Sequence, residues 1–291
     1  MGVLATRLRY GSLMVTLVAA LMWVDLQFFP YLTSGLIIAL FTLGAQAEFY
    51  GMLRSAGMAA SLKLGLLAGA YYLFTRLAPA IEWTFYHDTQ APAPQSTFDA
   101  GAHLAGAIVF LLILGVLQRR PQQAPQRIGA TLIGLLIVPF LLGYLIEIRY
   151  LPDGWAWLVF LVAVAKSGDS TAFFVGKYFG KRKLIPEVSP NKTWEGAVAS
   201  IVGSLAAAAV VSATAFSQAP ETGLWIGAAV VTNIGAQFGD LGESLLKRGC
   251  EVKDSAKLIP VMGGLFDMVD SFLVAAPVLL LYLRVSLPGL A

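Results

Sequence analysis

Residues 128–148, IGATLIGLLIVPFLLGYLIEI, form an apolar run with a single charged residue, Glu147. A transmembrane helix needs about 20 mostly apolar residues, so this run is long enough to cross a bilayer. The same reasoning along the chain predicts nine spans, at residues 9–28, 31–53, 60–80, 100–117, 128–148, 155–176, 195–216, 223–241 and 263–284. The first resembles a signal peptide, but a second apolar run follows at once, which favours a retained span. The sequence therefore predicts an all-α, polytopic integral membrane protein.

The composition supports lipid as the solvent for much of this chain. Of the 291 residues, 57% are hydrophobic and 13% are charged, whereas a soluble domain has about 45–50% and about 25%. The net charge of +3 is too small to indicate a nucleic-acid partner. The single cysteine, Cys250, excludes an intrachain disulfide, and we interpret it as an incidental small residue.

The basic residues predict the orientation of the spans. With the N-terminus inside, 16 of the 20 lysines and arginines fall on inner segments, as the positive-inside rule expects. The exceptions are Arg76, Arg149 and Arg284 on the outer side and Lys166 within a span. We expect nine spans in the inner cell membrane, with the C-terminus outside and the active site on the cytoplasmic side.

Polar residues divide the chain into two parts within one membrane domain. Residues 1–150 are mostly hydrophobic transmembrane scaffold, and residues 151–291 carry the polar motifs. The motifs lie at residues 166–196, 237–248 and 251–271, at the inner ends of spans or in inner loops.

Carboxylates are prominent in these motifs. Asp267 and Asp270 are spaced i, i+3, which places both on one helix face, and Asp240 and Glu243 repeat that spacing. Carboxylate oxygens suit Mg²⁺, which proteins usually bind through one or two carboxylates plus substrate phosphates. A charged side chain within a membrane span is costly, so it indicates a functional site. The alternative is structural ion pairing with the neighbouring cations Lys247, Arg248 and Lys253.

The basic residues of these motifs suggest contacts with phosphate. Lys192 lies in a Ser189-Pro-Asn-Lys-Thr turn directly before a span, where Ser189 or Thr193 could cap the helix with Glu195 in its first turn. A helix N-terminus beside a lysine is a natural phosphate site. Residues 181–183 are all basic and fit anionic lipid headgroups better.

The motifs that are missing narrow the chemistry. The chain has no G-x-x-x-x-G-K-[ST], H-E-x-x-H or G-x-S-x-G motif and no Cys/His cluster for zinc. Acids, lysines and glycines remain, which suit phosphoryl or nucleotidyl transfer, where catalysis is mostly positioning and charge neutralisation. A phosphate nucleophile is already largely ionised near neutral pH, so no histidine base is needed.

A long C-terminal pattern carries a family resemblance. It runs through Ser244, Lys247-Arg248, Lys253-Asp254, Pro260, Gly263-Gly264, Asp267 and Asp270. This pattern resembles the signature of the phosphatidate cytidylyltransferases, or CDP-diacylglycerol synthases. Gly239-Asp240 and Ser189-Pro-Asn-Lys192-Thr-Trp-Glu-Gly196 also resemble motifs of that family. The match covers roughly residues 165–275.

Two positions depart from the family pattern. The family's histidine is Met262 here, and its arginine is Met268. Because every matching acid and lysine is retained, we expect metal binding to survive and the basic contacts near the lipid or nucleotide to have changed.

The resemblance implies a helical fold with a polar cavity open to the cytoplasm. It also implies cytidylyl transfer from CTP to phosphatidic acid for phospholipid biosynthesis, with one or two Mg²⁺ ions and often a homodimer. The implied catalytic residues are Asp240, Lys253, Asp254 and Asp267. The implied substrate-binding residues are Ser189, Asn191, Lys192, Lys247 and Arg248. The implied metal ligands are Asp240, Asp267, Asp270 and Asp169.

Two other functions stay open at this point. A CTP-dependent kinase of polyprenols or phytol would use similar acids and lysines but transfer the γ-phosphoryl group. A cation transporter would place Asp169, Asp240, Asp267 and Asp270 along a path near mid-membrane. The acids instead cluster at inner ends beside lysines, which disfavours transport.

Overall fold

The computed structural model describes residues 20, 22–86, 100–119, 121–256 and 263–287. The chain forms two compact units. The first unit contains Met1–Tyr150 and Asp254–Met268, and the second contains Leu151–Lys253 and Val269–Ala291. The described residues 254–256 and 263–268 are thus grouped with the N-terminal half of the chain.

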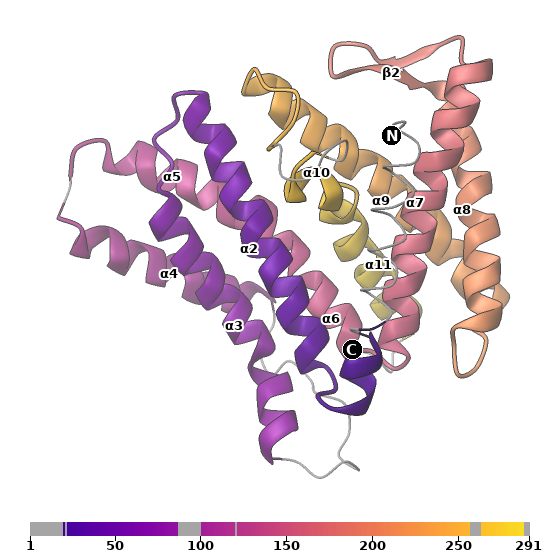
Figure 1. Ribbon diagram of the computed structural model, residues 1–291, viewed down its shortest axis with the longest axis horizontal. Helices are drawn as coiled ribbons and strands as arrows, with labels where there is room; N and C mark the ends of the chain where they lie inside the picture. The colour runs from indigo at the N-terminus through magenta and orange to yellow at the C-terminus, as the bar shows by residue number, and fades with distance from the viewer. Residues whose placement is uncertain (1–19, 21, 87–99, 120, 257–262, 288–291) are drawn as a thin grey trace. The chain divides into compact units, whose positions relative to one another are not determined.

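The first unit is built from helices of different lengths, most of them apolar (Figure 1). They are α2 (Leu32–Ser55), α3 (Leu62–Tyr86), α4 (Ala100–Leu117), α5 (Ala124–Leu135), the π-helix η1 (Leu136–Phe140) and α6 (Tyr144–Tyr150). The π-helix contains Pro139, whose missing N–H cannot continue the α-helical hydrogen bonds. Leu73, Leu111 and Leu135 are fully buried and pack in one hydrophobic core with Ile146.

Two buried ion pairs lie inside the first unit. Arg76 on α3 pairs with Glu147 on α6, and Nη2 of Arg149 lies 2.7 Å from Oδ2 of Asp25. The guanidinium of Arg149 also lies over the ring of Tyr31, 4.2 Å from its centroid. Arg76 and Arg149 are two of the exceptions to the positive-inside pattern. Because each is neutralised by a buried carboxylate, neither presents an unbalanced charge.

The second unit is a helical bundle with a small hairpin. Its elements are α7 (Gly154–Phe179), β1 (Lys183–Ile185), β2 (Ser189–Thr193), α8 (Trp194–Thr214), α9 (Thr222–Gly249) and α11 (Phe272–Ser286). The helix α10 (Leu265–Val269) precedes α11 and lies almost wholly in the first unit. In Figure 1 the hairpin lies at one end of α7 and α8. Its antiparallel strands pair Lys183 with Thr193 and Ile185 with Ser189.

Most predicted spans appear as helices at the expected places. Within the described residues, six helices are long and apolar enough to cross a membrane: 32–55, 62–85, 124–150, 154–179, 194–214 and 265–286. The predicted spans 100–117 and 223–241 are also helical, as α4 and within α9, but neither is among these six. Of the predicted span 9–28, residues 9–19 and 21 lie outside the described residues. The all-helical membrane fold is therefore supported, and the count of nine stays a prediction.

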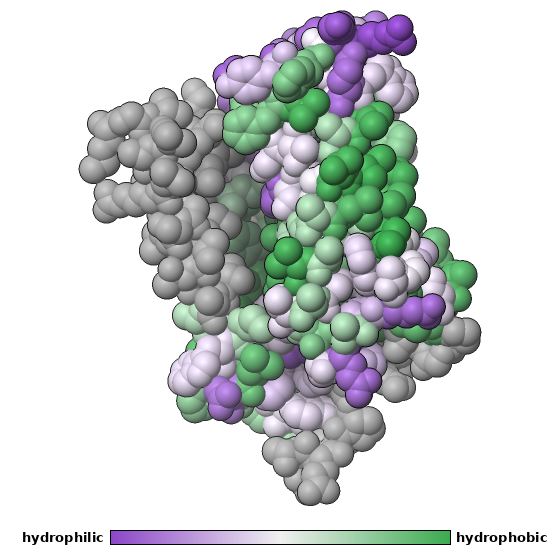
Figure 2. Space-filling model, turned by 90° about the vertical axis from the view of Figure 1, so that its right-hand side faces the viewer, coloured by the Kyte–Doolittle hydropathy of each residue, from purple (hydrophilic) through white to green (hydrophobic). Residues whose placement is uncertain are grey.

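One face of the second unit is strongly apolar. Val198, Val202 and Val210 on α8 are each more than 60% exposed. Figure 2 shows hydrophobic side chains gathered across the middle of this face and hydrophilic ones towards its ends. This distribution fits a helix face in contact with lipid.

Two local predictions were wrong. The segment 189–193 is strand β2, because it pairs with β1 and because Glu195 accepts hydrogen bonds from the N–H groups of Lys181 and Arg182. The span predicted at 263–284 is present at 265–286, but a turn at Asp270 and Ser271 divides it into α10 and α11, so the predicted continuous helix through Asp267 and Asp270 is wrong. An i, i+3 spacing defines a shared face only within an unbroken helix, so that argument for Asp267 and Asp270 no longer applies.

Candidate active site

Three carboxylates meet in the second unit. Asp240 and Glu243 lie on α9, and Asp270 lies in the turn before α11. Each offers an oxygen atom, and these oxygens all lie within 4.8 Å of one another. A glycine makes this approach feasible, because a Cβ at Gly239 would lie 2.5 Å from the carbonyl oxygen of Asp270. We call these three residues the acid cluster.

Two lysines offset part of the charge of the acid cluster. Nζ of Lys192 on β2 lies 2.7 Å from Oδ2 of Asp240. Nζ of Lys247 lies 2.7 Å from Oε1 of Glu243, whose side chain is only 1% exposed. A buried carboxylate is costly unless it is paired, which explains why α9 carries Lys247 one turn after Glu243. Three acids and two lysines leave one net negative charge.

Ser271 connects Asp270 to α7. Its buried hydroxyl oxygen lies 2.9 Å from Asp270 Oδ1 and 3.4 Å from Asp169 Oδ2, and Lys166 Nζ donates to it at 3.4 Å. A serine hydroxyl has one proton, so it can donate to only one of the two carboxylates at a time. Lys166 also lies 3.7 Å from Asp169. This places Asp169 beside Ser271, next to the acid cluster.

A cavity of about 600 Å³ opens between α7, the hairpin, α8 and α9. Its polar lining includes Asp169, Lys177, Lys183, Asn191, Lys192 and Asp240. The acids lie on the helices, whereas Asn191 and Lys192 come from β2. A cavity with several cationic side chains and two carboxylates suits an anionic ligand accompanied by a cation.

Part of the cavity wall belongs to a buried hydrogen-bond network. Gln237 donates to Ser200 Oγ at 2.8 Å and to Asn233 Oδ1 at 2.7 Å, and Asn233 donates to Ser204 Oγ at 2.8 Å. Ser204 in turn donates to the carbonyl of Val164 on α7 at 2.8 Å. Side-chain hydrogen bonds between helices help to fix their packing in a membrane. The network therefore holds α7, α8 and α9, which carry the cavity.

The start of α8 is capped by Thr193. Its hydroxyl oxygen accepts from the N–H of Gly196 at 3.2 Å. Of the two capping residues considered from the sequence, Thr193 is thus confirmed, and Glu195 lies in the first turn as expected. Ser189 instead begins β2, on the same strand as Lys192.

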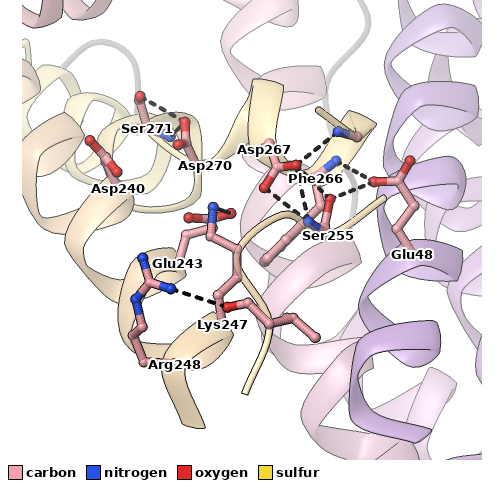
Figure 3. Close-up of polar contacts among 12 residues, drawn as sticks. Glu48, Asp240, Glu243, Lys247, Arg248, Ser255, Phe266, Asp267, Asp270 and Ser271 are labelled. Atoms are coloured by element: carbon pink, nitrogen blue, oxygen red, sulfur yellow. Dashed lines mark hydrogen bonds and ion pairs between the residues drawn. The ribbon is translucent and has the colours of Figure 1, made fainter. Parts of the chain in front are cut away.

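Asp267 has a separate environment in the first unit. Its Oδ2 accepts hydrogen bonds from the N–H groups of Gly264 at 2.8 Å and Ser255 at 3.1 Å, and it lies 3.0 Å from the hydroxyl oxygen of Ser255. Figure 3 shows Glu48 on the other side of the same serine. Asp267 is not a member of the acid cluster, so its part in metal binding stays a prediction.

The other predicted residues lie near the end of α9 and after it. Arg248 donates to the carbonyl of Val252 at 3.4 Å. Lys253 and Asp254 are both exposed. Lys253 is the last residue of a segment of the second unit, and Asp254 is the first residue of a segment of the first unit. Met262 lies outside the described residues. The roles assigned to these side chains by resemblance stay predictions.

Sequence reasoning undervalued three residues. For Glu243 the spacing leaves open a metal ligand or a partner of nearby cations, and in the structure this member of the acid cluster pairs with Lys247. Ser271 ends the 251–271 motif, and the sequence alone indicates no role for it. Glu48 is a carboxylate inside an apolar run, which is itself a signal of a function, but its partners lie far away in the sequence.

Comparisons with known proteins extend the resemblance across the chain. The profile of the cytidylyltransferase family matches residues 5–286. The chain is 38% identical over 174 residues to a phosphatidate cytidylyltransferase of Bacillus subtilis (strain 168), covering 60% of this chain and 64% of that protein. A protein of the same name from Brucella abortus (strain 2308) is 42% identical over 135 residues, or 45% of this chain and 48% of that protein.

A third relative gives a similar picture. A phosphatidate cytidylyltransferase of Haemophilus influenzae is 38% identical over 151 residues, which cover 48% of this chain and 52% of that protein. The matched stretches thus span between about half and two thirds of these relatives' lengths.

Proposed function

The chain belongs to the cytidylyltransferase family, and from this premise we propose that it transfers a cytidylyl group from CTP to phosphatidic acid. The products are CDP-diacylglycerol, a precursor in phospholipid biosynthesis, and pyrophosphate. Three relatives that bear the name of this activity, at 38–42% identity, support the assignment.

The observation that carries the proposal is the acid cluster with its two lysines. Asp240 belongs to both the acid cluster and the cavity lining, and Lys192, which pairs with Asp240, also lines the cavity. Nucleotidyl transfer needs cations that neutralise phosphate oxygens and acids that hold metal. In this site the lysines and the carboxylates are in direct contact, as the pairs Lys192–Asp240 and Lys247–Glu243 show.

The acid cluster fits a hard divalent cation. Asp240, Glu243 and Asp270 supply only oxygen donors, and Mg²⁺ is commonly held by one or two carboxylates plus substrate phosphates. Glu243 is almost fully buried, so the crowding of three carboxylates favours a bound cation. Mg²⁺ held there would supply charge neutralisation at the triphosphate.

The bond changes follow from the two substrates. An oxygen of the phosphatidate headgroup forms a bond to the α-phosphorus of CTP, and the bond from that phosphorus to the bridging oxygen of the β-phosphate breaks. Pyrophosphate leaves with that electron pair. The attacking phosphate is largely ionised near neutral pH, so none of these side chains has to remove a proton from it.

The residues of this chain bind and orient the phosphates. Lys192 exchanges its contact with Asp240 for a phosphate oxygen, and Lys177 and Lys183 supply further positive charge to the cavity. Phe173 also lines the cavity and is 60% exposed on α7, as suits a lipid that enters from the side. We infer that the site faces the cytoplasm at the inner cell membrane, in line with the basic residues of 181–183. A homodimer is the expected assembly, by resemblance alone.

A product assay tests this function. Purified protein in detergent is incubated with CTP labelled at the α-phosphate, phosphatidic acid and Mg²⁺. Label in CDP-diacylglycerol with release of pyrophosphate supports cytidylyl transfer, and chelator should abolish it. Free CDP with a phosphorylated lipid would instead identify a lipid kinase. The absence of both products would refute the proposal.

A further inference from the structure

Glu48 makes three hydrogen bonds to the segment that carries Asp267. Its Oε1 accepts from the N–H of Leu265 at 2.9 Å, and its Oε2 accepts from the N–H of Phe266 and from the hydroxyl of Ser255, both at 2.9 Å (Figure 3). Glu48 lies on α2, more than 200 residues earlier in the chain. All these residues belong to the first unit.

The donors explain why a carboxylate is retained in α2. Leu265 and Phe266 begin α10, where backbone N–H groups have no partner within the helix. A charged acceptor bonds such donors about twice as strongly as a neutral one. A carboxylate in an apolar helix is costly to keep, so its pairing with this segment indicates a purpose beyond packing.

The two glycines before α10 fit the same contact. Gly263 has φ of +87°, a conformation that other residues rarely adopt. A Cβ at Gly264 would lie 2.2 Å from Oε2 of Glu48 and 2.3 Å from the hydroxyl oxygen of Ser255. Any side chain at residue 264 would therefore displace the carboxylate.

Ser255 joins Glu48 to Asp267. Its hydroxyl oxygen lies 2.9 Å from Oε2 of Glu48 and 3.0 Å from Oδ2 of Asp267. Asp267 also accepts from the N–H of Gly264, the residue that packs against Glu48. The orientation of Asp267 thus depends on a short segment whose backbone is held by Glu48.

We propose that Glu48 is a positioning residue of the transferase, which holds residues 255 and 264–266 so that Asp267 is presented in a fixed orientation. The proposal rests on the proposed function and on the predicted role of Asp267 in turnover. Glu48 acts through the segment and does not touch the substrates.

Other acids of the first unit provide a contrast. Glu147 and Asp25 are buried against arginine side chains, as expected of charges that stabilise a helical core. The contacts of Glu48 are with two backbone N–H groups and a hydroxyl of the signature segment. Loss of Glu48 should therefore affect that segment more than the core.

The test compares Glu48→Gln with two other variants. Glutamine keeps the size of the side chain but places an NH₂ group against one of the N–H donors. Glu48→Asp keeps the charge but shortens the reach by one methylene. Glu82→Gln is the matched control, because Glu82 is an exposed acid on α3 of the same unit. If Glu48→Gln does not fold, Gly264→Ala disturbs the same contact from the other side.

Two readouts are measured for each variant. Hydrogen exchange of the peptide that contains Leu265 and Phe266 reports whether the segment is held, and steady-state kinetics separate kcat from KM for CTP. For Glu48→Gln we expect exchange about tenfold faster and kcat lower by about tenfold or more, as the loss of one charge-assisted hydrogen bond implies. We expect KM for CTP within about twofold of wild type, because the side chain does not bind the nucleotide. Glu48→Asp should be intermediate and Glu82→Gln unchanged.

The outcomes separate this inference from the proposed function. Unchanged exchange in Glu48→Gln and Gly264→Ala would overturn the inference, and so would faster exchange with an unchanged kcat. A wild-type protein that makes no CDP-lipid would refute the proposed function, and with it the effect of Glu48 on turnover. The exchange measurement would still decide whether Glu48 holds the segment.

Discussion

Replacing Asp270 by asparagine should stabilise the metal-free protein and abolish its response to Mg²⁺. Two unit charges 4.8 Å apart repel by about 3.5 kcal/mol at an effective dielectric constant of 20, and Asp270 faces both Asp240 and Glu243 at no more than that distance. Lys192 and Lys247 offset part of this repulsion. Partial exposure reduces it further, so we expect a net relief of about 1–3 kcal/mol on removing one charge.

The assay is thermal unfolding in detergent, with and without Mg²⁺. In chelator, Asp270→Asn should unfold at a temperature several degrees higher than wild type, since about 1 kcal/mol corresponds to about 2–4 °C in proteins of moderate size. Mg²⁺ should raise the unfolding temperature of the wild type and leave that of the variant nearly unchanged, because a ligand stabilises only the state that binds it. Transfer of the cytidylyl group should fall at least a hundredfold, on the order of one lost charge contact in the transition state.

Asparagine is nearly isosteric with aspartate and can still accept a hydrogen bond from Ser271, so the comparison isolates charge. A lower unfolding temperature for Asp270→Asn in chelator would show that the acid cluster stabilises the fold through its charges. If Mg²⁺ raised the unfolding temperature of Asp270→Asn as much as that of the wild type, the cation would bind at a site that does not include Asp270. Either result would refute the reasoning.

Four further experiments test other parts of the structure. Lys192→Ala should raise the apparent KM for CTP about tenfold or more, the scale of one charge-assisted contact, and an unchanged KM would remove this lysine from the nucleotide site. Gly239→Ala should destabilise the protein by about 1–3 kcal/mol, because its Cβ would meet the backbone of Asp270; thermal unfolding measures this, and a neutral result would contradict the close packing. Burial raises the pKa of the Cys250 thiol, so the folded protein contains less thiolate at pH 7 than the unfolded chain. Maleimide should therefore react faster with the denatured protein, and faster with the folded protein as the pH rises. Equal rates for the folded and denatured protein would show that the thiol is accessible to solvent. Tags at the two termini should report opposite sides of the membrane, and tags on the same side would contradict the predicted topology.

The helices were predictable because apolar length is a strong local signal. The predicted span 195–216 is α8 at Trp194–Thr214, and 155–176 is the main part of α7. The eighth span differs, because α9 continues to Gly249 through the polar motif. Hydropathy finds the apolar part of such a helix but cannot show that polar residues extend it.

The site was predictable in its residue types and less so in its grouping. Asp240 and Asp270 lie close together, because α9 packs closely at Gly239 against the turn that precedes α11, and metal binding by these two acids stays a prediction. The third acid is Glu243, whereas Asp267 is bonded within the first unit. Sequence spacing assumed one continuous helix, and the turn at Asp270 and Ser271 depends on tertiary contacts that spacing does not encode.

The hairpin and the role of Glu48 depend on partners that are distant or weakly signalled in sequence. The strand β2 forms because it pairs with β1, and Glu195 accepts a hydrogen bond from the N–H of Lys181, just before β1. The hairpin therefore cannot be predicted from either strand alone. Glu48 bonds residues more than 200 positions later. An acidic residue in an apolar run indicates that a partner exists but not where in the chain it lies.

The pair of Asp25 and Arg149 has a consequence for how the chain is synthesised into the membrane. The two residues are separated by 124 positions, so Asp25 leaves the ribosome long before its partner exists. A lone carboxylate in hydrocarbon is costly, and Asp25 is fully buried in the folded protein. Until Arg149 has been made, Asp25 lacks this partner, so we expect its carboxyl group to stay hydrated or protonated. We therefore expect the Asp25 segment to reach its final packing only after α6 has been made, and to be less protected in a nascent chain stopped before Arg149.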